Sequence, residues 1–292
     1  MLVRLLAVLL CLPLAASGPP LGAHRPDVDV QAHLDFAADP AFDSAVSLEY
    51  GGRFIGSGVL VAPGWVLTAA HHSVPLGTSE RLPSLAVVVG GEPVVVEAIV
   101  AHPNFGPDRP EGTPLVDLAL VRLAVPVDGA TPARLHDVDR DGSEVGRVGA
   151  VVGFGSVAEA TALVRDTGGD AGRRIGGLNR IDTMESTDYG PEYARPSGPT
   201  GDRYLYADFD WPAGDAPDDR PLDLEYVPLI GDSGSGLYVE TGGTWRLAAI
   251  TQGVVGPHQN DGLRDRPVHE TLAAFVRLAP HRTWISRTVA SD

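Results

Sequence analysis

The chain has 292 residues, of which 43% are hydrophobic and 21% charged, so it is long enough to bury a core and too apolar to be disordered throughout. Acidic residues outnumber basic ones by 38 to 22, and the resulting net charge of -16 argues against binding to the phosphates of nucleic acids. All 22 basic residues are arginine, which excludes a Schiff-base lysine or a phosphate-binding lysine.

The first 17 residues have the pattern of a secretory signal peptide. Arg4 precedes an apolar run over residues 5–14, and small residues follow at 15–17. Because the run is too short to span a bilayer, we expect no membrane association beyond this segment and a secreted or periplasmic mature protein. Cys11 is the single cysteine and lies inside the segment, so cleavage would leave no thiol for catalysis, disulfides or metal binding.

Residues 18–43 are polar, and we interpret them as an irregular N-terminal extension or pro-segment. From residue 44 onward, short runs rich in Val, Ile and Leu alternate with Gly and Pro, as is typical of β-strands. The predicted strands are 46–48, 54–61, 65–67, 85–89, 94–100, 118–123, 148–154, 204–206, 237–239 and 245–251. The pattern predicts an all-β fold closed into barrels, since closure removes exposed strand edges.

The second half of the chain is harder to interpret. Residues 156–226 have the least regular pattern, and the aspartate-rich stretch 202–225 is predicted to be a long solvated surface insertion. Residues 275–289 predict a terminal amphipathic helix that begins near Pro280.

Three separated patches supply residues that can work together chemically. His71 ends the apolar stretch WVLTAAH, and Asp117 is the one charge in the apolar run VDLALV, where a buried carboxylate requires a partner. Ser233 lies in the glycine-rich turn IGDSGSG, whose backbone N–H groups can point at one spot. A neutral histidine can take the proton of a serine hydroxyl, and a buried aspartate can hold the imidazole in the tautomer that this transfer needs.

These patches, in the order His, Asp, Ser, resemble the trypsin/chymotrypsin-like serine peptidase family. The similar stretches cover most of residues 44–292: SAVSLEYGGRFIGSGVLVAPGWVLTAAH, HPNF at 102–105, DLALVRLAVPV at 117–127, VVGFG at 151–155, GDSGSG at 231–236 and TWISRTVASD at 283–292. The resemblance implies two six-stranded antiparallel β-barrels, at about 44–130 and 145–292, with the active site in the cleft between them and a short C-terminal helix.

The resemblance also implies a function and its residues. The chain is expected to be a serine endopeptidase with the catalytic triad His71, Asp117 and Ser233, which acts on protein or peptide substrates without a cofactor or metal. The N–H groups of Gly231 and Ser233 would form the oxyanion hole. Val227 would lie at the floor of the specificity pocket, and its apolar side chain predicts no strong preference for Arg or Lys. Three residues would hold the substrate backbone as an added strand: Thr251, Gln252 and Gly253.

Some positions depart from the family's pattern. Active members of the family begin, after cleavage, with an apolar residue and glycines, and this new N-terminus reaches the aspartate beside the nucleophile, which is Asp232 here. Residues 25–45 contain no such sequence, so the partner of Asp232 is left open. Positions that form a disulfide in the family hold other residues, such as Ile55 and His72. Two alternatives stay open: a catalytically silent homologue that acts as a binding or regulatory protein, and an esterase with the same acyl chemistry. The oligomeric state is not predicted.

Residues 137–142, with the sequence DVDRDG, resemble the start of a calcium-binding loop. The twelfth position of that loop is Val148 instead of the usual glutamate. Both a calcium site and an ordinary acidic turn therefore remain possible interpretations.

Overall fold

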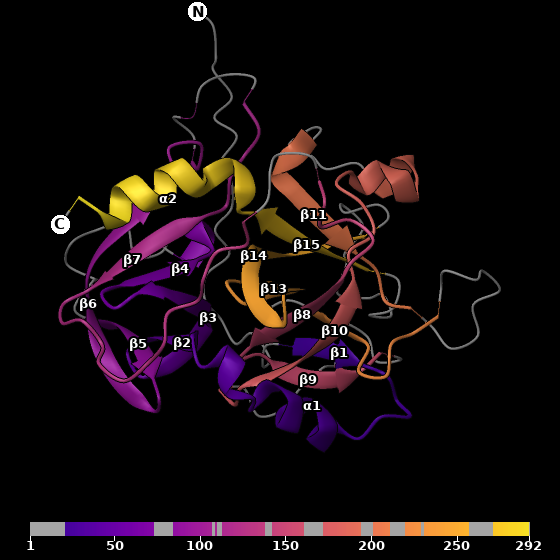
Figure 1. Cartoon of the computed structure of the whole chain (residues 1–292), viewed down its shortest axis with the longest axis horizontal. Coiled ribbons are helices and arrows are strands. Elements are labelled where there is room, and N and C mark those ends of the chain that lie inside the picture. The colour runs from indigo at the N-terminus through magenta and orange to yellow at the C-terminus, as the bar shows by residue number, and fades with distance from the viewer. Residues whose placement is uncertain are drawn as a thin grey trace, which may run out of the picture.

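A computed structural model describes residues 21–72, 84–106, 109, 113–137, 142–160, 172–193, 201–210, 220–228, 231–256 and 271–291. Two β-sheet units lie side by side, and the short C-terminal helix crosses the edge of the first unit (Figure 1). The signal-like residues 1–17 lie outside the described residues. The expected all-β fold with two six-stranded, barrel-like sheets and a short C-terminal helix is confirmed.

The first unit is a closed barrel of six antiparallel strands in the order β2-β3-β4-β7-β6-β5. Its strands are β2 (Ala45–Tyr50), β3 (Arg53–Ala62), β4 (Trp65–Thr68), β5 (Leu85–Val89), β6 (Glu92–Ala101) and β7 (Ala119–Leu123). Every second residue of β5 is buried, as expected where one strand face points into a core. The β-branched runs of the sequence therefore predict this barrel well.

The second unit is a six-stranded antiparallel sheet in the order β10-β8-β13-β14-β15-β11. Its strands are β8 (Val148–Gly153), β10 (Ile175–Arg180), β11 (Tyr204–Ala207), β13 (Gly236–Thr241), β14 (Thr244–Val255) and β15 (Leu272–Arg277). Past the end of β10, the backbone N–H of Asp182 and the carbonyl of Thr183 each bond to Tyr206 of β11 at 2.9 Å. These bonds bring the two edge strands together, which gives the sheet its barrel-like form.

Residues 21–43, here called the N-terminal arm, were expected to be irregular, but they form regular structure. Strand β1 (Leu21–His24) pairs in parallel with β9 (Ser156–Glu159) and antiparallel with β12 (Tyr226–Pro228). Helix α1 (Val30–Ala37) packs against β10, and the 3-10 turn η1 (Pro40–Phe42) follows it. The arm is thus built into the second unit of the fold.

Two further expectations about the last third of the chain were wrong. Residues 275–277 belong to strand β15 and not to the helix, although the predicted start near Pro280 is confirmed by the 3-10 turn η11 (Ala279–His281), which leads into helix α2 (Arg282–Val289). The stretch 202–225 is not solvated throughout, because every residue of β11 is buried and Glu225 is fully buried. Residues 211–219 of that stretch lie outside the described residues.

A shared core joins the two units. One cluster of buried residues combines Leu67 and Leu118 of the first unit with Tyr204 and Ile250 of the second, and Ile285 of α2 packs into it. Separate clusters fill each barrel. The relative placement of the two units is therefore held by apolar burial, the main stabilising contribution to folding in water.

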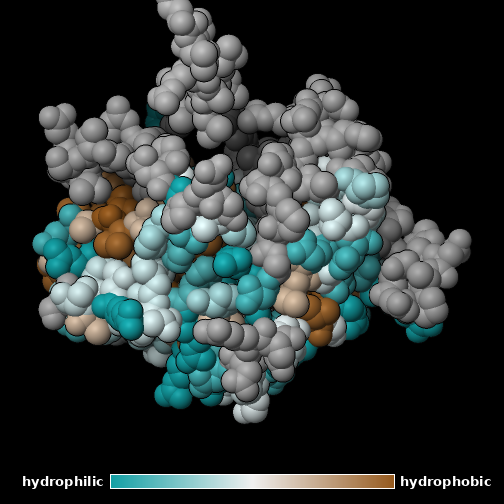
Figure 2. Space-filling model, turned by 90° about the horizontal axis from the view of Figure 1, so that it is seen from above, coloured by the Kyte–Doolittle hydropathy of each residue, from teal (hydrophilic) through white to brown (hydrophobic). Residues whose placement is uncertain are grey.

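The surface offers few large apolar areas among the described residues. Seen from above, these residues are mostly hydrophilic or neutral, and brown residues form separate patches (Figure 2). No helix in the described parts of the chain is long and apolar enough to cross a membrane. Within the same residues, no three His, Cys, Asp or Glu side chains are grouped so that they could hold a metal ion. Residues 138–141 of the calcium-like stretch lie outside them, and Asp137 pairs with Arg282 at 2.6 Å.

Two titratable residues are buried where the N-terminal arm meets the second unit. His33 of α1 donates through Nδ1 to the carbonyl of Gly176 at 3.0 Å, and burial outweighs this bond and lowers the pKa of His33 to about 4. Glu225 accepts the N–H of Leu222 at 2.8 Å, while its Oε1 has no partner. Burial raises the pKa of Glu225 to about 8, and the charge of Asp210 acts in the same direction.

The melting temperature is therefore expected to fall as the pH rises from about 6.5 to 8.5. Glu225 keeps its proton up to about pH 8 in the folded protein and loses it near pH 4.5 in the unfolded chain. Its contribution to the free energy of unfolding is therefore complete below pH 4.5 and is lost as the pH rises through 8. His33 contributes in the opposite sense, because its stabilisation is complete above 6.5 and is lost as pH falls towards 4.

Scanning fluorimetry across this pH range measures the slope directly. Glu225→Gln should remove most of the decline between pH 6.5 and 8.5. Asp223→Asn, which neutralises an exposed carboxylate on the same loop, should leave the slope unchanged. An undiminished slope in Glu225→Gln would show that another group is responsible.

Candidate active site

The structure brings His71 and Asp117 together in the first unit. His71 lies in the 3-10 turn η2 (Ala70–His72), directly after the fully buried strand β4, and Asp117 lies just before β7. Asp117 accepts the backbone N–H of His71 on Oδ1 at 2.8 Å and the ring Nδ1–H on Oδ2 at 2.6 Å. The Asp117 side chain is 3% exposed and that of His71 is 40% exposed. The carboxylate is thus enclosed, while the imidazole reaches the surface.

This geometry fixes the chemistry of both groups. Burial opposes ionisation of Asp117, but the hydrogen bonds from His71 outweigh it and hold the pKa of the carboxyl below its usual value. With Nδ1–H donated to Asp117, the neutral ring carries its free lone pair on Nε2. His71 is therefore arranged to accept a proton at Nε2.

Ser233 lies in a tight turn between β12 and β13. Gly234 follows it with a φ of +88°, and its N–H donates to the carbonyl of Thr251 at 2.8 Å. The N–H of Ser235 donates to the carbonyl of Asp232 at 3.0 Å. Glycine suits the position after Ser233 because other residues rarely adopt this backbone conformation.

The hydroxyl of Ser233 is directed at a β-bulge. In β14, Thr251 and Gly253 pair with successive residues of β15, and Gln252 between them is the extra residue. The bulge brings the carbonyl of Gln252 within 3.2 Å of the Ser233 hydroxyl, which donates to it. His71 and Ser233 are both described residues, and no hydrogen bond joins them in this structure.

The carboxylate of Asp232, whose partner was left open, accepts a backbone amide. Its Oδ1 receives the N–H of Gly155 at 3.1 Å, and Asp232 is 1% exposed. A Cβ on Gly155 would lie 2.0 Å from that oxygen, so only glycine allows the approach. The bond ties the turn that holds Ser233 to the end of β8.

The residues proposed from the sequence for the oxyanion hole and for substrate binding lie in different surroundings. The N–H groups of Gly231 and Ser233 donate to no acceptor among the described residues. Val227 is fully buried in β12, where it pairs with Ala23 of the arm. Thr251 is fully buried, and its hydroxyl lies 2.6 Å from that of Ser235. The polar groups of Thr251 are therefore directed towards the turn.

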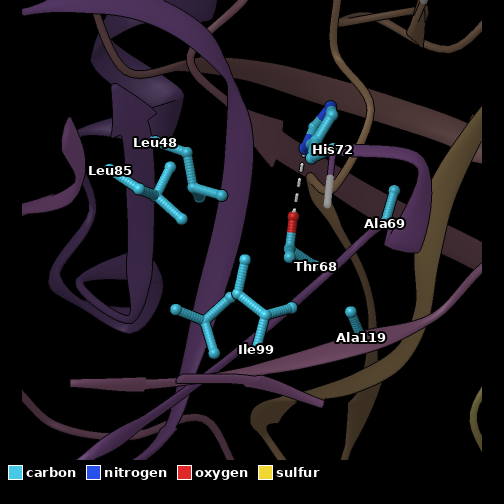
Figure 3. Close-up of a pocket in the computed structure, with 8 residues that line it drawn as sticks. Leu48, Thr68, Ala69, His72, Leu85, Ile99 and Ala119 are labelled. Carbon is cyan, nitrogen blue, oxygen red and sulfur yellow. Dashed lines mark hydrogen bonds between the residues drawn. The ribbon is translucent and has the colours of Figure 1, made fainter. Parts of the chain in front are cut away.

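His72, one of the two residues noted at disulfide positions of the family, faces Gly56. A Cβ on Gly56 would lie 2.0 Å from Cε1 of His72, so the ring occupies the space that a side chain there would need. The ring borders a cavity of about 10 Å³ lined by Leu48, Thr68, Ala69, Leu85, Ile99, Ala119 and Val121, and its Nδ1 lies 3.4 Å from the hydroxyl of Thr68 (Figure 3). Partial burial, and then the neighbouring His71, lower the pKa of His72 to about 3.

Sequence reasoning missed Ser57 at this site. Its backbone N–H donates to the carbonyl of Ser233 at 2.9 Å, which links the two units of the fold at the candidate nucleophile. The one available signal is its place between two glycines in IGSG, and that signal does not indicate a contact 176 positions along the chain.

Comparisons with known proteins show which proteins the chain is similar to. The family model described as Trypsin matches residues 35–168, a range that contains His71 and Asp117. Human serine protease 56 is 37% identical over 131 residues, which is 42% of this chain and 21% of the human protein. Mouse serine protease 56 is 36% identical over 131 residues, with the same coverage. The chain matches about a fifth of the length of these curated relatives.

A solved structure extends the comparison to most of the chain. Neuropsin, described as a serine protease expressed in the limbic system of mouse brain, aligns with a TM-score of 0.58. The alignment covers 87% of this chain and 96% of neuropsin, at 22% sequence identity. At that identity the likeness establishes the fold, including the second unit that contains Ser233.

Proposed function

Because the chain belongs to the trypsin/chymotrypsin-like serine peptidase family, we propose that it is an exported serine endopeptidase. The observation that carries the proposal is the pair of hydrogen bonds from His71 to Asp117, at 2.6 and 2.8 Å. The bond from Nδ1–H fixes the imidazole tautomer that a base needs, and the bond from the backbone N–H holds the carboxylate beside the ring. Export is proposed from the signal-like residues 1–17.

In the proposed reaction, Ser233 Oγ attacks the carbonyl carbon of a peptide bond. Nε2 of His71 takes the hydroxyl proton, and the Asp117 carboxylate stabilises the imidazolium that forms. The N–H groups of Gly231 and Ser233 stabilise the negative oxygen of the tetrahedral intermediate. His71 then gives its proton to the leaving amine, which leaves an acyl group on Ser233 that water removes by the reverse sequence.

The Ser233 hydroxyl must leave its present partner before it can react. It donates to the carbonyl of Gln252, and a rotation about the Cα–Cβ bond would redirect it towards His71. The rotation exchanges one staggered side-chain position for another. We propose that a bound substrate favours the rotated position, with Gln252 and Gly253 holding the substrate backbone.

One observation favours a second candidate function. The bond from Ser233 to Gln252 is the arrangement expected if the fold serves as a binding or regulatory protein with a silent site. The hydrogen-bonded pair of His71 and the enclosed Asp117 carboxylate favours the enzyme, because a silent site has no need of it.

A fluorophosphonate probe separates these two functions. The protein without residues 1–17 should be labelled at Ser233, and Ser233→Ala should not. The labelled protein should also hydrolyse peptides with a small or apolar residue before the cleaved bond faster than peptides with Arg there. Failure of labelling would favour the silent homologue, and labelling of Ser233→Ala would identify a different nucleophile.

A further inference from the structure

Ser57 of β3 is a fully buried residue that bonds to three separate segments. Its N–H donates to the carbonyl of Ser233 at 2.9 Å. Its hydroxyl accepts the N–H of Phe154 at 2.9 Å, and its carbonyl accepts the hydroxyl of Thr68 at 2.7 Å. Every polar group of Ser57 thus contacts another part of the candidate site.

Each of these segments holds a reactive group in place. Phe154 precedes Gly155, whose N–H binds the carboxylate of Asp232 at 3.1 Å. Thr68 ends β4, three positions before His71. Ser57 therefore connects the strand that leads to the base with both segments of the second unit that fix the turn of the nucleophile.

Glycines make this close approach possible. A Cβ on Gly234 would lie 1.9 Å from the carbonyl oxygen of Ser57 and 2.4 Å from the hydroxyl of Thr68. A Cβ on Gly153 would lie 3.1 Å from the Ser57 hydroxyl. The backbone is thus packed directly against Ser57, and a shift of this residue would be transmitted to the turn.

The contacts continue from Ser57 to the base. Thr68 has one hydroxyl hydrogen and gives it to the carbonyl of Ser57, so its oxygen is left to accept from Nδ1–H of His72 at 3.4 Å (Figure 3). The ring of His72 contacts that of His71 edge-on, with 4.6 Å between centroids. An unbroken path of contacts therefore runs from the carbonyl of Ser233 to the imidazole of His71.

We propose that the hydroxyl of Ser57 is a positioning group for acylation, which holds the Phe154–Gly155 segment, and through it the turn of Asp232 and Ser233, against the first unit. The inference rests on the proposed peptidase function. Removing the hydroxyl would leave the N–H of Phe154 without its acceptor at a partly buried position, and the segment would shift to find another. The nucleophile would then move relative to His71, and small displacements of reacting groups slow a reaction strongly.

The test compares Ser57→Ala with Ser47→Ala. Ser47 of β2 is the cross-strand partner of Ser57 and is also buried, so the control deletes the same group from the same barrel. Ser57→Ala should lower kcat and the rate of fluorophosphonate labelling about 10- to 100-fold and change KM less than about twofold. It should also speed amide hydrogen exchange at 153–155. Ser47→Ala should leave these values unchanged.

Several outcomes would overturn the inference. One is that Ser57→Ala keeps the wild-type rates of fluorophosphonate labelling and of amide hydrogen exchange. Another is that Ser57→Ala and Ser47→Ala lose equal amounts of kcat. The third is that KM rises in Ser57→Ala while kcat stays constant. If the alanine variant does not fold, Ser57→Cys takes its place, because a thiol is a weak acceptor of similar size; wild-type rates in that variant would also count against it. Absence of labelling in the wild type would instead refute the proposed function, and hydrogen exchange would still test the bond from Phe154.

Discussion

Asp117→Asn is expected to lower kcat about 10⁴-fold, the loss that the corresponding change causes in a peptidase with a Ser-His-Asp triad. The reason lies in the two bonds that Asp117 accepts from His71, at 2.8 and 2.6 Å. An asparagine has one carbonyl oxygen and one NH2 group, so it can accept only one of them well. If its NH2 faces the ring, the proton of His71 moves to Nε2, and the imidazole can no longer take the proton of Ser233.

Steady-state hydrolysis of a peptide substrate at pH 8 measures this effect. Asp43→Asn serves as the control, because Asp43 pairs with Arg174 at 2.8 Å away from the site and its side chain is 51% exposed. That variant should keep wild-type kcat. The two melting temperatures show whether either protein has lost its fold. A decrease of less than tenfold in Asp117→Asn would contradict the role proposed for the carboxylate.

Arg277→Met is expected to destabilise the protein by about 3–5 kcal/mol. Arg277 of β15 and Glu144 form a two-bond ion pair at 2.8 and 2.9 Å, and their side chains are 0% and 1% exposed. Arg277 also donates to the carbonyl of Asp202 at 3.3 Å. Without the guanidinium, the carboxylate of Glu144 would remain in the interior as an uncompensated charge, or would have to take up a proton.

Urea unfolding at pH 7 gives the loss directly. The double variant Arg277→Met/Glu144→Met should recover much of it, because two apolar side chains replace a buried ion pair at little net cost. Arg122→Met breaks a pair with Glu97 at 2.9 Å in which the side chains are 35% and 51% exposed, and should cost no more than about 1 kcal/mol. Equal losses in the two single variants would show that burial of the Arg277 pair has no special weight.

The sequence predicts the first barrel well and the second less well, for identifiable reasons. Strands of the first barrel contain long β-branched runs, and pairs such as β2 with β3 and β3 with β4 follow one another in the chain. The missed strand β1 has the sequence LGAH, without any such run, and its partners are far away in the chain. The residues 275–277 fit either a helix or a strand, and pairing with β11 and β14 decides for the strand.

The candidate site shows the same division. His71, Asp117 and Ser233 could be proposed from local patterns because each needs particular neighbours. The role of Ser57 depends instead on the meeting of positions 57, 154 and 233, which no local pattern encodes. Which residue of β3 lies opposite His72 depends on the register of that strand. A shift of the register by one residue would place Ile55 there instead of Gly56.

The pairing of β1 with β12 has a consequence for how the chain is made. Arg25, directly after β1, bonds to the carbonyl of Leu222, which lies 197 positions further along. The ribosome synthesises the arm about 200 residues before its partner strand β12. The first barrel can complete its hydrogen bonds before β12 has been synthesised, so the arm, although it is made early, is among the last segments to be ordered. Contacts of such long sequence separation slow folding, and the unpaired edge left in the meantime is a place where a chaperone could bind.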